Sequence, residues 1–529
     1  MNGVKETVDV ELASVGSLNK QVLSKDEEEL NALGYRQDLK REFGFWATFS
    51  ISFALLALLP SVASTLDYCM GYAGTAGMSW GWVLSMIGVQ AVACSMAELC
   101  SAMPTSGGLY YASAVLAPAG WGPLVSWITG WSNWICLVTS SPAIDYALAN
   151  MMLSLKRVKD PAYHPQHYQV FLLTTGLMIV QSVISSLPTK ALGRFNLAGT
   201  WFNGTAAIVA LIVILAANNR EGPKFNPTNE VWGDLRNTTE WPDGVAILMS
   251  FMGIIWAMSG YDAPFHLSEE TSNSNMNSPR AIVWTSIVGG VFGWALQLTI
   301  AYTCTNVEDI IDSSLGQPFV TYLQQVLSDE LVFFITALTI VSAFFAGQAS
   351  MISASRVVYA YSRDGCFPIS RFWARVNKYT QTPVNAVWFN TVIGVASLLL
   401  LFAGDIAIGA IFSVGAIGGY TAFTLPVAMK VIFARDSFRP GPWNLGKLSR
   451  PVGFLSVSFI LLMAPILCMP ESKGKHLNPQ NMNWTVLVYF GPMGFSLIWY
   501  AIYARHHFKG PKVSVAHAIH IDGLDFHDE

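Results

Sequence analysis

The sequence predicts an all-α integral membrane protein with twelve transmembrane helices. Of its 529 residues, 52% are hydrophobic and only 12% are charged, whereas a soluble globular domain carries about 25% charged residues. About twelve apolar segments approach the roughly 20 residues that a helix needs to cross a bilayer. Two of these segments, the first and the sixth, contain proline or glycine deep inside the apolar run.

The charge distribution predicts how these spans are oriented. In chain order the spans are residues 45–64, 78–100, 122–150, 169–188, 196–217, 243–265, 281–303, 331–357, 385–403, 406–428, 452–469 and 484–503. Most Lys and Arg residues fall in segments on the same side as the N-terminus, and such an excess marks the cytoplasmic side. Both termini are therefore predicted to be cytoplasmic, with a disordered tail at 1–44 and a second tail at 504–529.

The first and sixth spans are interrupted in corresponding places, by Pro60 and Pro264. Because these spans are five apart, the chain is predicted to hold two five-helix repeats, residues 45–217 and 218–428, the second inverted. Residues 429–503 would add two helices. Matching interruptions indicate a transporter whose substrate binds near the bilayer midplane. Two ordinary proline kinks would give the same pattern.

The interruption in the sixth span contains an ionisable residue, Asp262. Gly260 costs a helix interior about 1 kcal/mol relative to Ala, and Pro264 costs about 3 kcal/mol or more. A membrane helix tolerates such a break only where protein or water meets the freed backbone groups. A carboxylate at that depth predicts a functional site. The structural alternative is a proline kink beside a buried, hydrogen-bonded aspartate.

Several longer motifs carry a family resemblance. They include Leu58–Ser64, Ala97–Tyr111, Gly130–Trp134, Ser362–Gly365 and Phe438–Pro442. Together they resemble fungal GABA permeases, in the amino acid/choline branch of the amino acid–polyamine–organocation (APC) superfamily. The resemblance covers most of the chain. It implies a LeuT-like fold with broken helices 1 and 6, and secondary active import of amino acids, GABA, choline or polyamines.

A zwitterionic substrate needs partners for a carboxylate and an ammonium group. Backbone N–H groups at a half-helix start suit the carboxylate, and carbonyls, a carboxylate or aromatic faces suit the ammonium. The candidate substrate-binding residues are Phe53, Ala54, Leu55 and Ala57 in the first span, and Trp256, Ser259, Gly260, Tyr261 and Asp262 in the sixth. For the two aromatic residues, simple packing explains their presence equally well.

Coupling to an ion gradient calls for a group that changes charge between access states. The candidate coupling or gating residues are the carboxylates Glu98, Asp145 and Asp262. Glu98 and Asp145 could equally act as gate or structural residues, and Glu269 and Glu270 are expected to face cytoplasmic water. Hydroxyls in the eighth span could instead bind sodium: Ser350, Ser353 and Ser355. Proton coupling is favoured over sodium, chiefly through the family resemblance.

No enzymatic, metal or nucleic-acid motif is complete in this sequence. His266, Glu269 and Glu270 approach a zinc motif but lack its second histidine.

GABA-like amino acids are the leading predicted substrates, and choline or polyamines are alternatives. A nutrient-sensing receptor on the same scaffold is a third possibility. The plasma membrane is favoured over the vacuolar membrane. The last two spans could contact lipid or a second copy, and Lys20 and Lys25 could be ubiquitination sites used by a ligase adaptor. Basic residues at the inner end of span eight, Arg356 and Arg363 among them, are expected to anchor to lipid headgroups.

Overall fold

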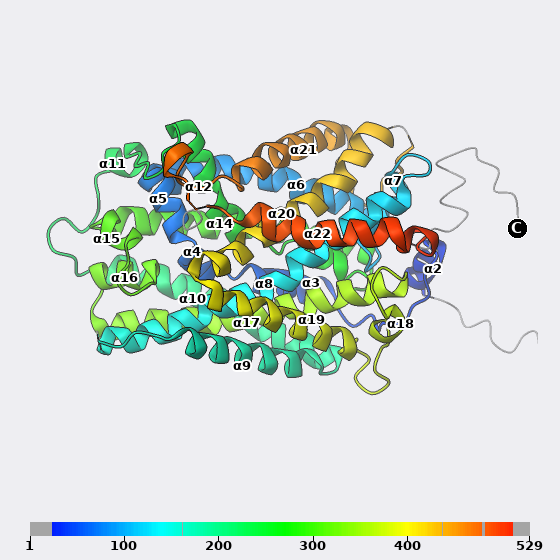
Figure 1. The fold of residues 1–529 in the computed structure, drawn as a ribbon, viewed down its shortest axis with the longest axis horizontal. Helices are drawn as coiled ribbons and strands as arrows, with labels where there is room; N and C mark the ends of the chain where they lie inside the picture. Colours follow the sequence, from blue (N-terminus) through cyan, green and yellow to red (C-terminus); the bar gives the residue numbers. More distant parts are fainter. Residues whose placement is uncertain (1–23, 161, 436, 479–481, 512–529) are drawn as a thin grey trace, which may run out of the picture.

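The computed structural model describes residues 24–160, 162–435, 437–478 and 482–511. Its helices run along one long axis and form a bundle (Figure 1). Ten helices within the described ranges are long and apolar enough to cross a membrane. Regular strands are absent from those ranges, where the extended pairing is one isolated bridge between Phe43 and Thr271. The predicted all-α membrane fold is confirmed, whereas the count of twelve spans and the inverted repeat remain predictions.

The helices of the predicted first half occur at the expected positions. They are α3 Phe45–Leu56, α4 Leu58–Ser64, α5 Leu66–Ala76, η1 Gly77–Gly81, α6 Trp82–Ala102, α7 Leu109–Leu116, α8 Gly122–Lys159, α9 His167–Ser185 and α10 Thr189–Ala216. The first candidate span, Phe45–Ser64, has the predicted bounds. Helix α5 follows it and is interrupted at Gly74, where φ is 59°.

The rest of the chain forms a second set of long helices with short ones at their ends. They are α11 Thr228–Gly233, α12 Asp243–Ala257, α13 Ala263–His266, α14 Ser274–Thr303, α15 Val307–Ile311, α16 Pro318–Val326, α17 Asp329–Arg363, α18 Ser370–Trp373, α19 Val384–Ser397, η2 Leu398–Ala403, α20 Asp405–Ala428, η3 Met429–Phe433, η4 Gly446–Leu448, α21 Ser449–Ile466, η5 Gly474–His476, α22 Thr485–Ile502 and η6 Ala504–His506. The long helix α8 packs against both α17 and α20.

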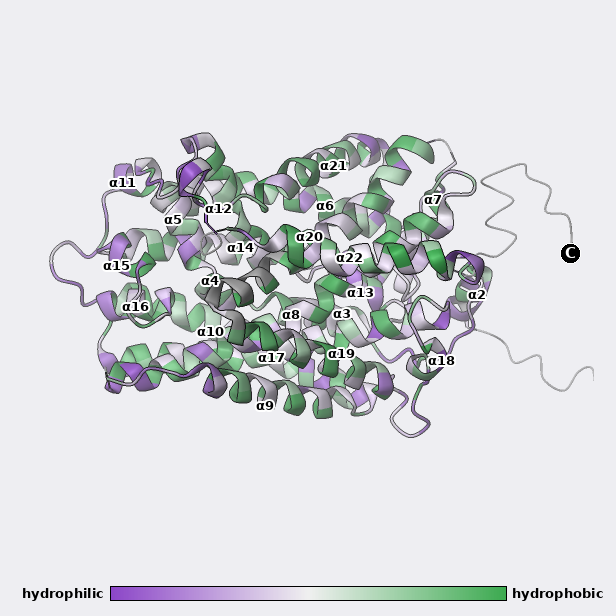
Figure 2. Ribbon diagram, viewed as in Figure 1, coloured by the Kyte–Doolittle hydropathy of each residue, from purple (hydrophilic) through white to green (hydrophobic). Residues whose placement is uncertain are grey.

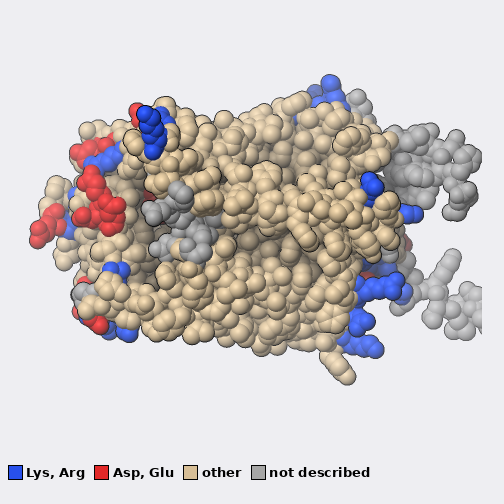
Figure 3. Space-filling view, viewed as in Figure 1, with Lys and Arg blue, Asp and Glu red and all other residues tan. Residues whose placement is uncertain are grey.

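Polar residues gather at the two ends of the bundle and apolar residues cover its middle (Figure 2). One end carries α2 (Lys25–Ala32), α7 and α18, and the other carries α11, α15 and α16 (Figure 1). On the face drawn in Figure 3, acidic side chains lie at the second end, Lys and Arg lie at both, and the wide belt between is nearly uncharged. The end with α2 is the inner end in the predicted orientation.

The segment before the first span is more ordered than predicted. Ser24 and Glu27 form a capping box that starts α2, which satisfies backbone donors at the helix start. Further on, Phe43 N donates to Glu270 O at 3.0 Å, and Ser272 N donates to Phe43 O at 2.8 Å. These backbone bonds attach the chain to the inner end before α3 begins. Residues 1–23, with the candidate ubiquitination site Lys20, and residues 512–529 lie outside the described residues.

Candidate functional site

A cavity of about 60 Å³ lies where the interruptions of the first and sixth spans face each other. A water molecule needs roughly 10–15 Å³ measured in this way. The cavity therefore has room for only a few waters, and a larger ligand requires its lining to move. The lining consists of Leu55, Ser61, Cys136, Leu137, Ser140, Ile144, Ile255, Trp256, Met258, Ser259, Gly260, Tyr261, Asp262, Ser350, Gly415, Ala416, Gly419, Tyr420 and Phe423.

The first interruption is a single residue, Ala57, between α3 and α4. Its φ is 36° and its ψ is 68°, a left-handed conformation that residues with a side chain rarely adopt. Pro60 cannot donate to the carbonyl four residues back, at Leu56. The hydroxyl of Ser61 donates to that Leu56 carbonyl instead, at 2.7 Å. A side chain thus replaces the backbone bond that the proline removes.

The second interruption follows the same chemistry. Helix α12 ends at Ala257 and α13 begins at Ala263. Pro264 cannot donate to the carbonyl of Gly260, and the hydroxyl of Ser52 donates to it at 3.1 Å. Because Ser52 belongs to α3, this bond joins the two broken spans. It also occupies the carbonyl of Gly260, one of the predicted substrate-binding residues.

Six of the predicted substrate-binding residues line the cavity and three do not. Leu55, Trp256, Ser259, Gly260, Tyr261 and Asp262 are in the lining. Phe53, Ala54 and Ala57 are buried, with 8%, 0% and 0% of their surface exposed, but lie outside the lining. Successive residues of a helix point about 100° apart, so Leu55 faces the cavity while its neighbours pack elsewhere. The polar group from this span that reaches the cavity is Ser61.

Gly260→Ala is expected to abolish transport and lower the thermal stability. The φ of Gly260 is +102°, and a Cβ there would lie 2.5 Å from Cγ of Leu55. The backbone strain costs about 1–3 kcal/mol, and overpacking costs a similar amount. Uptake by cells and the melting temperature of the purified protein measure the two effects.

Gly176→Ala is the matched control for this substitution, because a Cβ at Gly176 meets nothing within 4 Å. Gly176 lies inside α9, where alanine is the better helix former by about 1 kcal/mol. Equal uptake by the two variants would show that the protein accommodates a Cβ atom at residue 260, which would contradict the prediction.

A buried polar chain leads from the cavity toward the inner end. The Asp262 carboxylate, whose side chain is 7% exposed, lies 3.4 Å from Nε2 of fully buried His266. Nδ2 of Asn133 lies 3.2 Å from the same His266 nitrogen and donates to the Tyr361 hydroxyl at 3.0 Å. A protonated Nε2 donates to Asp262, and a deprotonated Nε2 accepts from Asn133. The hydrogen bonding of Asp262 therefore depends on whether Nε2 of His266 carries a proton.

The other two predicted coupling carboxylates do not reach the cavity. Glu98 forms an ion pair with Lys430 and accepts hydrogen bonds from the Ser449 hydroxyl at 2.7 Å and from Leu445 N at 3.3 Å. Glu98 thus holds the connection between α20 and α21. This contact fits the structural role that the sequence analysis gave as the alternative to a coupling role. Asp145 is fully buried and accepts from Nε2 of Gln181 at 2.7 Å.

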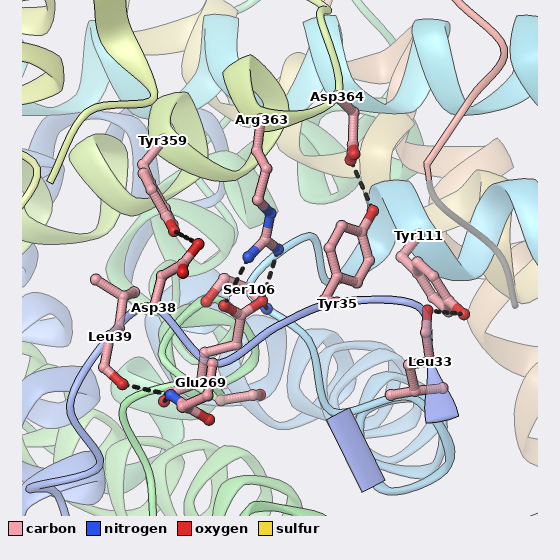
Figure 4. A network of polar contacts seen from close by, with 12 residues as sticks. Leu33, Tyr35, Asp38, Leu39, Ser106, Tyr111, Glu269, Tyr359, Arg363 and Asp364 are labelled. Carbon is pink, nitrogen blue, oxygen red and sulfur yellow. Dashed lines mark hydrogen bonds and ion pairs between the residues drawn. The ribbon is translucent and has the colours of Figure 1, made fainter. Parts of the chain in front are cut away.

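The expectation that Glu269 and Glu270 face water is wrong, because both residues are fully buried. Arg363 donates to the two carboxylate oxygens of Glu269 at 3.0 and 2.8 Å, and the backbone N–H of Ser106 donates at 3.0 Å (Figure 4). Arg356 pairs with Glu270 at 2.8 and 3.3 Å. Arg356 and Arg363 are therefore not lipid anchors; they neutralise buried carboxylates.

The segment after α2 crosses this buried ion pair. The ring of Tyr35 lies 4.0 Å from Cζ of Arg363, and its hydroxyl donates to Asp364 at 2.7 Å (Figure 4). The Tyr359 hydroxyl donates to Asp38 at 3.3 Å. Arg41 donates to the carbonyls of residues 268 and 271 at 3.1 and 2.7 Å. Burial lowers the pKa of Arg41, which the carboxylates of residues 26 and 269 oppose.

Comparison with known proteins identifies the family. The sequence model of a family described as "Amino acid permease" matches residues 43–492, which is most of the chain. The chain belongs to the amino acid permease family. This permease is similar to an uncharacterized amino-acid permease of Schizosaccharomyces pombe, with 51% identity over 497 residues, covering 94% of this chain and 91% of the relative.

Two further relatives extend the comparison. A Candida albicans protein named "Putative polyamine transporter" is 47% identical over 515 residues, covering 96% of this chain and 93% of that protein. The amino-acid permease BAT1 of Arabidopsis thaliana is 30% identical over 504 residues, covering 93% of this chain and 97% of BAT1. The predicted membership of the APC superfamily is confirmed, and the permease is a transporter and not an enzyme.

Several residues of the site were not predicted from the sequence. His266 had been considered only as part of an incomplete zinc motif, although its position four residues after Asp262 places the two side chains on one helix face. The cavity residues of α8 and α20 carry no comparable signal. Cys136 and Ser140 lie in an apolar helix, and Tyr420 and Phe423 are ordinary membrane aromatics. Only the folded chain brings these residues together.

Proposed function

We propose that this permease imports GABA or related amino acids by alternating access, coupled to protons. The observation that carries the proposal is the Asp262 carboxylate, which lines the cavity between the two broken helices. A carboxylate there attracts an ammonium group in a low-dielectric setting, where the pairing is far stronger than in water. Trp256 and Tyr420 line the same cavity and can add cation–π attraction, worth up to about 2 kcal/mol.

The carboxylate of the substrate needs a donor, and the Ser350 hydroxyl can supply one, whereas two other serines of the lining already donate elsewhere. Ser140 and Ser259 donate to backbone carbonyls of their own helices, at 2.7 and 3.0 Å. The Ser350 hydroxyl is buried and lines the cavity, and it has no hydrogen-bond partner within the described part of the chain. A buried hydroxyl without a partner costs free energy. A bound carboxylate would relieve that cost at Ser350.

Protons are the proposed coupling ion, with sodium as the less favoured alternative. Asp262 is paired with His266, whose side chain changes hydrogen-bonding role on protonation. A proton on this pair would alter the charge that the substrate meets. The ion pair of Glu269 and Arg363, under the segment after α2, is the proposed inner closure. We place both termini in the cytoplasm and the permease in the plasma membrane.

A polyamine is the second candidate substrate. The Candida albicans relative at 47% identity bears a polyamine transporter's name, which favours this class over choline. The cavity offers one carboxylate, Asp262, among its described lining residues. A polyamine carries at least two ammonium groups, so a second acidic residue would have to join the site when the lining moves. A receptor that binds the same ligands without transport remains the third alternative.

Competition uptake tests the substrate and the coupling together. The permease is expressed in a host without amino acid permeases, and uptake of radiolabelled GABA is measured at pH 5 and pH 7.5. We expect saturable uptake that is several-fold faster at pH 5. Saturable uptake of radiolabelled spermidine in the same cells, without saturable uptake of GABA, would replace the first candidate with the second. Equal rates at both pH values, with dependence on sodium, would overturn proton coupling.

A further inference from the structure

A second hollow lies at the inner end, where the connection between α20 and α21 approaches the end of α6. Its volume is about 480 Å³. Its charged lining residues are Lys430, Arg435, Lys447 and Arg450, together with Glu98. Glu98 neutralises Lys430 through their ion pair. Arg435 and Lys447 give the described lining an excess of positive charge.

The walls of this basic hollow are fixed by hydrogen bonds. Glu98 accepts from the Ser449 hydroxyl at 2.7 Å and from Leu445 N at 3.3 Å. The Arg450 guanidinium donates to the backbone carbonyl of Arg435 at 3.3 Å. These bonds join α6, the end of α20 and the start of α21. The hollow is therefore a built part of the fold, and Arg435 and Lys447 are exposed at it.

The hollow lies beside side chains that suit the hydrocarbon of a bilayer. Phe433, Leu448 and Phe454 are 56%, 62% and 56% exposed, and they belong to the same helices as the basic residues. In a membrane protein such exposed apolar side chains face lipid tails. The basic hollow thus lies where the apolar surface ends and lipid headgroups begin.

We propose that this hollow binds a phosphate-bearing anion, and that the headgroup of an anionic phospholipid is its source. Arg and Lys recognise phosphate oxygens through charge-assisted hydrogen bonds, and basic pockets between membrane helices on the cytoplasmic side suit phospholipid headgroups. The nearby exposed side chains of Phe433 and Leu448 favour a lipid over a soluble anion, because they would contact the acyl chains of the bound lipid.

A bound headgroup would act on the transport site through α20. Lys430 follows this helix, in η3, and Gly415, Gly419 and Tyr420 of α20 line the substrate cavity. Occupancy of the hollow would hold the inner end of α20 against α6 and α21. The inference does not depend on which substrate the permease carries.

Binding to the purified full-length permease tests the proposal. In neutral detergent, the protein is titrated with short-chain phosphatidic acid, with inorganic phosphate, and with the uncharged short-chain diacylglycerol. We expect saturable binding of phosphatidic acid only. Arg435→Gln combined with Lys447→Gln is expected to weaken it roughly 25-fold, at about fivefold for each charge near the surface.

Arg371→Gln combined with Lys378→Gln is the matched control. It removes the same charge from exposed residues at the inner end that lie outside the hollow. We expect this control to bind within twofold of the unmodified protein. Equal weakening in both pairs, or no saturable binding, would overturn the proposal. Binding of inorganic phosphate as tight as that of the lipid would support the anion site and replace its source with a soluble anion.

Discussion

Asp262→Asn is expected to reduce substrate uptake by roughly 30-fold to more than 1,000-fold while the protein still reaches the membrane. Asparagine has nearly the same size, so the packing around the cavity is retained. The substitution removes the negative charge that faces the substrate ammonium group. Removing one member of a buried, hydrogen-bonded charge pair costs about 2–5 kcal/mol, and about 1.4 kcal/mol corresponds to a factor of ten. Initial uptake rates, normalised to surface protein, measure the loss.

Asp145→Asn is the control that distinguishes the loss of a substrate-binding charge from the general effect of neutralising a buried carboxylate. Asp145 is as deeply buried as Asp262 and accepts one hydrogen bond, from Gln181, but it does not line the cavity. The asparagine oxygen can still accept that bond, so we expect this variant to retain most uptake. Loss of uptake in Asp145→Asn with retention in Asp262→Asn would place the functional carboxylate in α8 and contradict the proposed site.

The local features of the fold could be predicted from sequence because they have local causes. The breaks near Pro60 and Pro264 follow from the missing proline N–H, and Gly260 and Asp262 mark the second break directly. The serine hydroxyls that satisfy the freed carbonyls were not predicted. Ser52 donates to the Gly260 carbonyl although the two residues are 208 positions apart in the sequence. The periodicity of neither helix indicates that contact.

The buried ion pairs could not be predicted for the same reason. Glu269 and Glu270 follow α13 without a nearby basic residue, so sequence analysis assigned them to water. Their partners Arg363 and Arg356 lie 94 and 86 residues away. In the sequence those arginines resemble lipid anchors at the end of a span. Folding brings opposite charges of two separate segments together, and each offsets part of the desolvation cost of the other.

Arg363→Gln is expected to destabilise the permease by about 3–5 kcal/mol, because it leaves the buried Glu269 carboxylate without its countercharge. Glu269 is fully buried and receives two hydrogen bonds from Arg363. The Ser106 N–H would be its remaining donor among those assigned to the side chain. Arg363 also lies over the Tyr35 ring, so the substitution loosens the segment after α2. We expect a lower melting temperature in detergent and little uptake.

A double-mutant cycle distinguishes this charge effect from simple loss of packing. Glu269→Gln with Arg363→Gln removes both charges of this pair, and two amides can hydrogen-bond in place of the ion pair. We therefore expect the double variant to recover at least half of the stability lost in Arg363→Gln. Uptake should recover less, because a neutral pair no longer attracts across the inner closure. The exposed Arg371→Gln serves as the control for charge alone, and a single Arg363→Gln variant as stable as that control would contradict a closure built on this ion pair.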